Sequence, residues 1–203
     1  VIDMGDDTVY VQYQTAQWVE AYPDGGVVKF DLQGNLIWSY GFSYSGYYRG
    51  EAGAGYAKFA TGSDQLVELP NGDTVFGVHM GSDQCSSTLV AVDSSGKEKW
   101  RRHWNGNPSD DMCGGLDAVK SAGGNNVWVH IRLGPELHER LLLIDSSGNI
   151  LTRNYMYGRF SHPASGLQSD GSFHFGDLSL NRFTRIAPDG SYPDGIGGWT
   201  FDV

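Results

Sequence analysis

A short pattern recurs four times along the chain and constrains its fold more than any other feature. Each copy is a run of β-forming residues that ends in a tight turn closed by a glycine: Gly34, Gly96, Gly148 and Gly190. In the first three copies the turn begins with an aspartate, whose carboxylate can accept hydrogen bonds from the backbone ahead of it, and the glycine tolerates a positive φ. The fourth copy has Ala187 in place of this aspartate. Such repetition predicts one structural unit that is used several times.

Every turn is followed by another expected strand and preceded by another expected hairpin. Trp38 and Trp100 stand four residues past their turn glycines, Thr152 takes this place in the third copy, and an insertion delays the fourth strand to 198–203. Upstream hairpin turns are indicated near 71–72, 123–124 and 170–171, with a weaker copy near 5–6. Each unit therefore has four short strands, A to D, and the units are about 40 to 60 residues long, close to a propeller blade.

The run of strand, Asp-x-x-Gly turn and strand with tryptophan resembles the pyrroloquinoline-quinone-like (PQQ-like) repeat of β-propellers. The hairpin at 69–73, Leu-Pro-Asn-Gly-Asp, is also similar to blades of arylsulfotransferase-type propellers. The resemblance implies an all-β fold, a β-propeller of about four four-stranded antiparallel blades. We expect a single domain over 1–203, with blades at approximately 1–40, 63–104, 116–157 and 164–203.

Four blades are fewer than the six to eight that such families use. The sequence leaves open whether the ring closes with four blades, is part of a larger ring, or is completed by a second chain. The chain begins with Val1 and shows neither an initiator methionine nor a signal peptide, which indicates a processed product or a piece of a longer polypeptide.

Charge and hydropathy narrow the possible partners. The formal charge is −10, from 24 acidic and 14 basic residues, so no basic surface for nucleic acid is expected. No apolar run approaches the roughly 18 residues of a membrane span.

Cys85 and Cys113 are both expected on one face, where a disulfide would tie two loops together; two buried thiols are the alternative. A secreted, periplasmic or cell-surface location is predicted.

Long connections, where binding residues concentrate, are expected on the face that carries the D-to-A connections and the B-to-C hairpins. The connection at 41–62 is the richest in aromatic residues. Its tyrosines, with an arginine and a glutamate, could form a stacking platform for a sugar or a peptide, although the rings could equally pack between blades. The ligand-binding candidates in this connection are Tyr44, Tyr47, Tyr48, Arg49, Glu51 and Tyr56.

The other connections offer fewer candidates. Asp110 and Asp111 carry oxygen ligands but match no calcium loop, so a solvated acidic loop is favoured and no metal is predicted. Aligning the B strands on their turns, with an error of at least one residue, puts four residues at similar heights: Gln12, Val78, His130 and Asp177. His130 and Asp177, with Arg132 and His162, are therefore expected to converge, and they join the list of candidates.

These features predict a non-catalytic binding module that recognises a glycan or a protein through the loop face. One alternative is a propeller enzyme, an arylsulfotransferase-like transferase or a polysaccharide-active enzyme, that uses His130, Arg132 and His162. Histidines held by local hydrogen bonds are the simpler interpretation of these residues. A second alternative is an assembly module whose open blade edge pairs with a copy of itself or with a parent polypeptide. No cofactor is predicted, since the repeat is structural.

Overall fold

A computed structural model covers the whole chain. The structure describes residues 2–3, 8–14, 25–42, 57–58, 66–80, 87–104, 115–133, 138–157, 166–167, 172–177, 182–187, 189, 191 and 199–200. Within these residues all regular structure is β-strand. No helix in this described part is long and apolar enough to cross a membrane.

The strands form antiparallel sheets in which, apart from β5 and β6, strands that follow one another in sequence pair with one another. The first sheet contains β1 (Ile2–Asp3), β2 (Thr8–Gln14), β3 (Gly25–Asp31) and β4 (Leu36–Phe42). The second contains β5 (Ala57–Lys58), β6 (Leu66–Glu68), β7 (Thr74–Met80), β8 (Ser87–Val92) and β9 (Glu98–Trp104). The third contains β10 (Gly115–Ser121), β11 (Val127–Leu133), β12 (His138–Ile144) and β13 (Ile150–Tyr157). The fourth contains β14 (Gly166–Leu167), β15 (Phe173–Asp177), β16 (Arg182–Ile186) and β17 (Trp199–Thr200).

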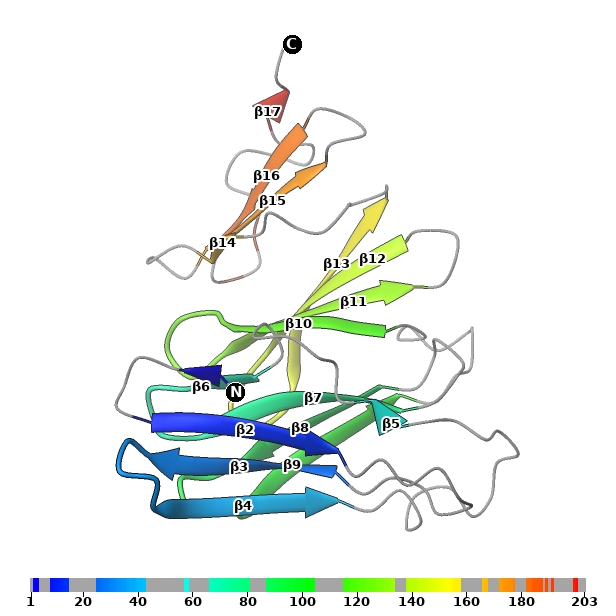
Figure 1. The fold of residues 1–203 in the computed structure, drawn as a ribbon. Helices are drawn as coiled ribbons and strands as arrows, with labels where there is room; N and C mark the ends of the chain where they lie inside the picture. The colour runs from blue at the N-terminus through cyan, green and yellow to red at the C-terminus, as the bar shows by residue number, and fades with distance from the viewer. Residues whose placement is uncertain are drawn as a thin grey trace, which may run out of the picture.

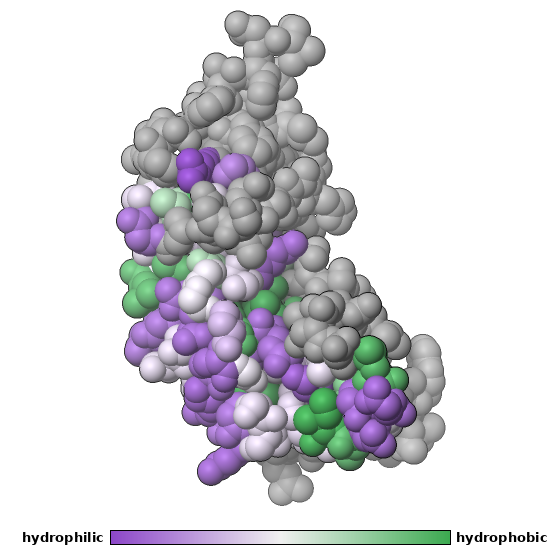
Figure 2. Space-filling view, turned by 90° about the vertical axis from the view of Figure 1, so that its left-hand side faces the viewer, coloured by the Kyte–Doolittle hydropathy of each residue, from purple (hydrophilic) through white to green (hydrophobic). Residues whose placement is uncertain are grey.

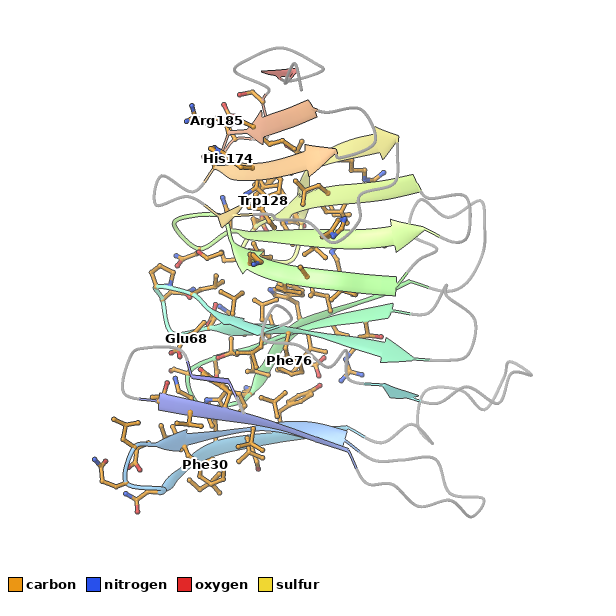
Figure 3. The ribbon with its side chains drawn as sticks, turned by 45° about the horizontal axis from the view of Figure 1, so that its top comes forward. Phe30, Glu68, Phe76, Trp128, His174 and Arg185 are labelled. Atoms are coloured by element: carbon orange, nitrogen blue, oxygen red, sulfur yellow. The ribbon has the colours of Figure 1, made fainter. Side chains whose placement is uncertain are left out.

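The four sheets follow one another in chain order, from β4 at the bottom of Figure 1 to β17 at the top. Consecutive meanders of four strands stacked in this way are the blades of a β-propeller, which confirms the predicted fold class. We number the sheets as blades 1 to 4. Blades 1 and 4 lie at opposite ends of the molecule in both ribbon views, so the described residues form an open arc (Figures 1 and 3).

Blade 2 begins earlier than its predicted start at residue 63. Its inner edge is made of two pieces, because β5 and β6 both pair with β7: Lys58 pairs with His79, and Val67 pairs with Val75. The strand β5 therefore lies inside the segment 41–62 that was predicted to be a loop. Two residues without β-branched or aromatic side chains give no strand signal in the sequence, and their pairing depends on β7.

The recurring turns have the expected chemistry. Gly96 has φ +82°, and its N–H donates to the Asp93 carbonyl at 2.8 Å. The Asp93 carboxylate accepts hydrogen bonds from the N–H groups of Ser95 (2.9 Å) and Lys97 (3.0 Å), and bonds from the Ser95 side chain and the Lys97 backbone lower the pKa of the Asp93 carboxyl. In the fourth copy Asp189 takes over the capping, because its carboxylate accepts from the Ser191 N–H at 2.9 Å.

The tryptophans of the repeat dock each blade on the next one. Trp100 of blade 2 donates its indole N–H to the Ser146 carbonyl of blade 3 at 2.9 Å, and its ring covers Gly148. Trp38 of blade 1 covers Gly96 of blade 2 in the same way. In blade 3, Thr152 occupies the position of the tryptophan, and its hydroxyl donates to the Asp189 carbonyl of blade 4 at 3.4 Å. The turn glycine is therefore required twice, for its positive φ and for the absence of a Cβ beneath the indole.

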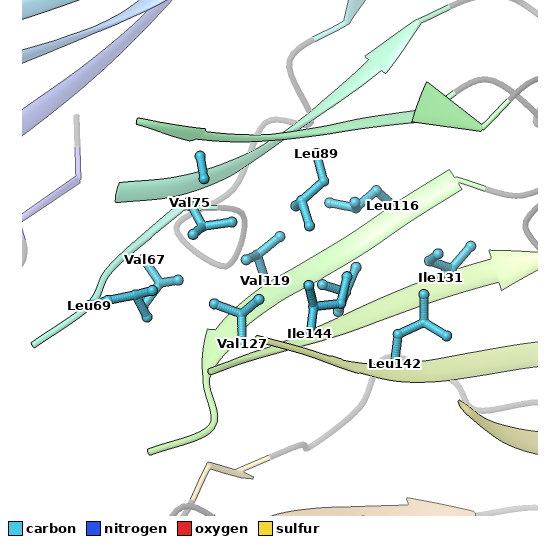
Figure 4. Packing of buried hydrophobic residues seen from close by; sticks show 12 residues of the cluster. Val67, Leu69, Val75, Leu89, Leu116, Val119, Val127, Ile131, Leu142 and Ile144 are labelled. Carbon is cyan, nitrogen blue, oxygen red and sulfur yellow. The ribbon is translucent and has the colours of Figure 1, made fainter. Parts of the chain in front are cut away.

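The largest apolar core described lies between blades 2 and 3 (Figure 4). Alternate residues of facing strands point toward each other, as the two-residue period of β-strands dictates. The blade 2 residues of this cluster are Val67, Leu69, Val75, Leu89 and Ala91; those of blade 3 are Leu116, Val119, Val127, Val129, Ile131, Leu142 and Ile144.

Candidate functional site

The two rims of the arc are built differently. One rim carries tight turns such as 32–35, 94–97 and 146–149, and we call it the turn face. The strands β2, β4 and β11 all point to the opposite rim in Figure 1. Antiparallel order therefore places the ends that flank 15–24, 43–56, 81–86, 105–114, 134–137 and 158–165 on that opposite rim, the connection face. The backbone thus groups the connections in which most candidate residues were predicted.

Most candidate residues themselves lie outside the described part of the chain. These are Tyr44, Tyr47, Tyr48, Arg49, Glu51, Tyr56, Asp110, Asp111 and His162, together with Cys85 and Cys113. Their roles, and the disulfide, stay predictions. Arg132 and Asp177 are described at the level of the backbone, in β11 and β15.

His130 is the candidate whose side chain is best defined. It lies in β11 opposite Leu141, and it is 2% exposed. Counting from the strand pairs beside each turn, His130 shares its register position with Gln12, Gly77 and Gly176. The predicted alignment with Val78 and Asp177 was one residue off. Adjacent strand residues belong to opposite sheet faces, so the position of Asp177 is on the other face of its blade from that of His130.

A buried polar cluster that the sequence analysis missed joins blades 1 and 2. The Lys29 ammonium lies 2.7 Å from both carboxylate oxygens of Glu68, and the side chains of the pair are 8% and 18% exposed. The Tyr10 hydroxyl donates to Glu68 at 2.5 Å and lies 3.1 Å from the Thr74 hydroxyl. Lys29 Nζ also sits 5.1 Å from the centre of the Tyr10 ring. The signal was present in the sequence, since Lys29 interrupts an apolar strand.

A second polar cluster at this junction is more exposed. The Arg101 guanidinium lies 2.6 Å from the Tyr40 hydroxyl and 2.5 Å from Glu98, while Tyr40 donates to Glu98. Burial of the phenol, followed by its hydrogen bond to Glu98, raises the pKa of Tyr40 to about 12. Tyr40 therefore stays neutral at physiological pH and acts as a hydrogen-bond donor. Both clusters position blade 1 on blade 2.

Blade 4 contains a serine and a histidine in contact. The Ser172 hydroxyl lies 3.2 Å from Nε2 of His174. Ser172 has no exposed surface, so a substrate cannot reach its hydroxyl in this conformation. Nowhere in the described residues does a group of three or more histidine, cysteine, aspartate or glutamate side chains lie close enough to hold a metal ion.

The chain is a β-propeller by its own architecture, and comparisons with known proteins add no family to that class. No family model and no curated sequence matches it. Its fold is similar to a protein of unknown function from Bacteroides caccae, with 10% identity, a TM-score of 0.47, and coverage of 86% of this chain and 54% of the other.

Two further solved structures are similar at the same level. A virginiamycin B lyase from Staphylococcus aureus shares 14% identity, a TM-score of 0.47, and coverage of 94% of this chain and 56% of the lyase. A europium-containing methanol dehydrogenase shares 17% identity and a TM-score of 0.47 over 92% of this chain and 39% of the enzyme. The chain spans about half the length of the first of these structures.

Proposed function

We propose that this chain is a propeller module with PQQ-like repeats that binds a glycan or a protein through its connection face. The observation that carries the proposal is the asymmetry of the two rims. The turn face is closed by short, internally hydrogen-bonded turns. The connection face holds most of the long segments between the described strands, the exception being 187–198 between β16 and β17 on the turn face, and such segments supply binding residues on a rigid scaffold.

The segment 43–56 is the proposed centre of the site. It contains four tyrosines, an arginine and a glutamate among small residues. Aromatic rings stack on the apolar faces of sugars and peptides, while the charged pair supplies directional hydrogen bonds. The segment joins β4 of blade 1 to β5 of blade 2. The Lys29–Glu68 and Tyr40–Arg101 contacts fix these two blades relative to each other, and this anchoring supports a preorganised site.

The location and the disulfide belong to the same proposal. Cys85 lies in the segment 81–86 and Cys113 in 105–114, and both segments start from strand ends on the connection face. A Cys85–Cys113 bridge would restrain that face and would require an oxidising compartment, in line with a secreted, periplasmic or cell-surface protein. Thiol labelling of the native protein tests the bridge, and free labelling of both cysteines would refute it.

The binding proposal is tested with a glycan array and with tryptophan-fluorescence titrations of the ligands that the array identifies. Substituting Tyr47→Ala together with Tyr48→Ala is expected to weaken binding at least tenfold, because two stacking rings are lost. A matched double variant on the turn face, Lys97→Ala with Ser147→Ala, is expected to bind like the unmodified protein. Equal affinity of all three proteins for a ligand would place the site elsewhere.

A further inference from the structure

Each blade has a rear face, toward the preceding blade, and a front face, toward the following one. In blades 2 and 3 the rear face presents the same four register positions from the second and third strands, and no residue there is more than 2% exposed. These residues are Thr74, Phe76, Val90 and Val92 in blade 2, and Val127, Val129, Leu142 and Ile144 in blade 3. A buried and largely apolar rear face is therefore the mark of an occupied junction.

The rear face of blade 1 has the same construction but is incompletely covered. Its four positions are all apolar, as they are in blade 3, yet each residue is only half-buried: Val9, Val11, Val28 and Phe30. The turn glycine agrees with this. A Cβ on Gly96 or Gly148 would meet a tryptophan within 3 Å, whereas no atom of the described residues lies within 4 Å of that position on Gly34. Figure 2 shows hydrophobic surface at the lower end of the molecule, where blade 1 lies.

The front face of blade 4 is incompletely covered as well. Arg185 and His174 occupy the register positions that Lys29 and Tyr10 occupy in blade 1. Lys29 and Tyr10 are buried against blade 2, but Arg185 and His174 are half-buried. Figure 3 shows Phe30 at the lower end of the arc and both blade 4 residues at the upper end. The two incompletely covered faces are thus a front face and a rear face, the two partners of a blade junction.

The charged pair of the junction between blades 1 and 2, and one of its two aromatic positions, have counterparts on these two faces. There, Lys29 binds Glu68, and the Tyr40 ring packs edge-on against Phe76 with ring centres 5.5 Å apart. Asp3, which pairs with Val9, holds the register position of Glu68, which pairs with Thr74. Arg185 has the register position of Lys29. By the same counting, Trp199 has the register position of Tyr40, and Val11 has that of Phe76.

We propose that a second copy of this chain places the front face of its blade 4 on the rear face of blade 1. The basic residue Arg185 of one copy then faces the acidic position Asp3 of the other, as Lys29 faces Glu68 within the chain. Because both copies carry both faces, two identical junctions form around a twofold axis. Two arcs of four blades close a ring of eight, a blade number that propellers use, and no rear face is left uncovered.

Sedimentation equilibrium of the 203-residue chain tests the proposal. We expect a mass twice the 22.2 kDa of one copy. Asp3→Lys and Arg185→Glu should each give a monomer, since each variant places like charges together at both junctions. Mixing the two variants should restore the dimer. One junction of the mixed pair is then native and the other has the two charges exchanged, so both are attractive.

Restoration by mixing distinguishes a docking defect from a folding defect, because two misfolded chains would not recover. The matched control is Leu151→Lys, a charge placed on an exposed residue of blade 3, which should leave the dimer intact. A monomer at the highest soluble concentration would overturn the proposal and would leave a blade of another polypeptide as the occupant. A dimer that resists both charge variants, or variants that stay monomeric after mixing, would overturn it equally.

Discussion

The side chains that join blades 1 and 2 illustrate how much a single residue can decide. Lys29 lies in a strand whose neighbours are apolar, and its ammonium group would be costly to bury alone. Glu68 compensates this charge with both carboxylate oxygens, and the Tyr10 hydroxyl satisfies the carboxylate further. The cluster therefore fixes how blade 1 packs on blade 2. Removing one member should destabilise the protein, because the remaining members lose a buried partner.

Glu68→Gln is expected to destabilise the protein by roughly 3 kcal/mol, because it leaves the buried Lys29 without a counter-charge. The double variant Lys29→Met with Glu68→Gln should recover part of this loss. Glu98→Gln serves as the control at the same junction, since Glu98 is more exposed and its ion pair should contribute less than about 1 kcal/mol. Urea denaturation measures all three; equal losses for Glu68→Gln and Glu98→Gln would contradict the burial argument.

At the scale of the element, the C-to-D hairpin is the unit that the chain repeats. Its aspartate caps the turn, its glycine takes a positive φ, and the strand after it delivers the residue that docks on the next hairpin. The same four-residue turn thus serves both local geometry and the packing of blades. The two roles can be separated, because some positive-φ glycines of the chain lie beneath an indole and others do not.

Gly148→Ala is expected to cost more than Gly34→Ala. The two glycines stand in equivalent turns and have nearly the same φ, +83° and +82°, so the backbone strain of an alanine, about 1 kcal/mol, is common to both. A Cβ on Gly148 would also lie 2.8 Å from Trp100 Cδ2, whereas no atom of the described residues lies within 4 Å of a Cβ on Gly34. Displacing the indole should add about 1 kcal/mol or more, measurable by urea denaturation. Identical losses for the two variants would mean that the Trp100 contact contributes nothing.

At the scale of the whole molecule, stability is distributed unevenly along the arc. The described apolar cluster lies entirely between blades 2 and 3, while blade 1 is attached through polar clusters as well as through Trp38. Regions with more buried apolar contacts open less often, so local opening should differ between blades.

Hydrogen exchange should therefore show the slowest amides in β8, β11 and β12, whose residues form the centre of that cluster. Amides of β16 in blade 4 should exchange faster, because no residue of that strand belongs to this cluster. Mass spectrometry of proteolytic fragments measures this order. Equal protection across all four blades would show instead that the arc opens only as one cooperative unit.

The all-β class, the four blades and the turn chemistry could be predicted because they depend on local patterns. Asp93 and Gly96 determine their turn whatever lies around them. Alternating apolar residues indicate a strand whichever blade packs against it. The register of His130 with Asp177 was misjudged by one residue because turn-based counting does not detect small differences in hairpin length. The strand β5 was missed because its pairing comes from β7 rather than from its own residues.

The sequence by itself determined the repeat, the tight turns and the position of each docking residue, since these depend on neighbours along the chain. Only the tertiary structure decided which side chains meet between blades, as Lys29 and Glu68 do across 39 positions. It also decided that the blades form an open arc with one apolar rear face incompletely covered. Contacts between blades depend on how whole sheets stack, and a pattern read within one blade contains no information about its neighbour.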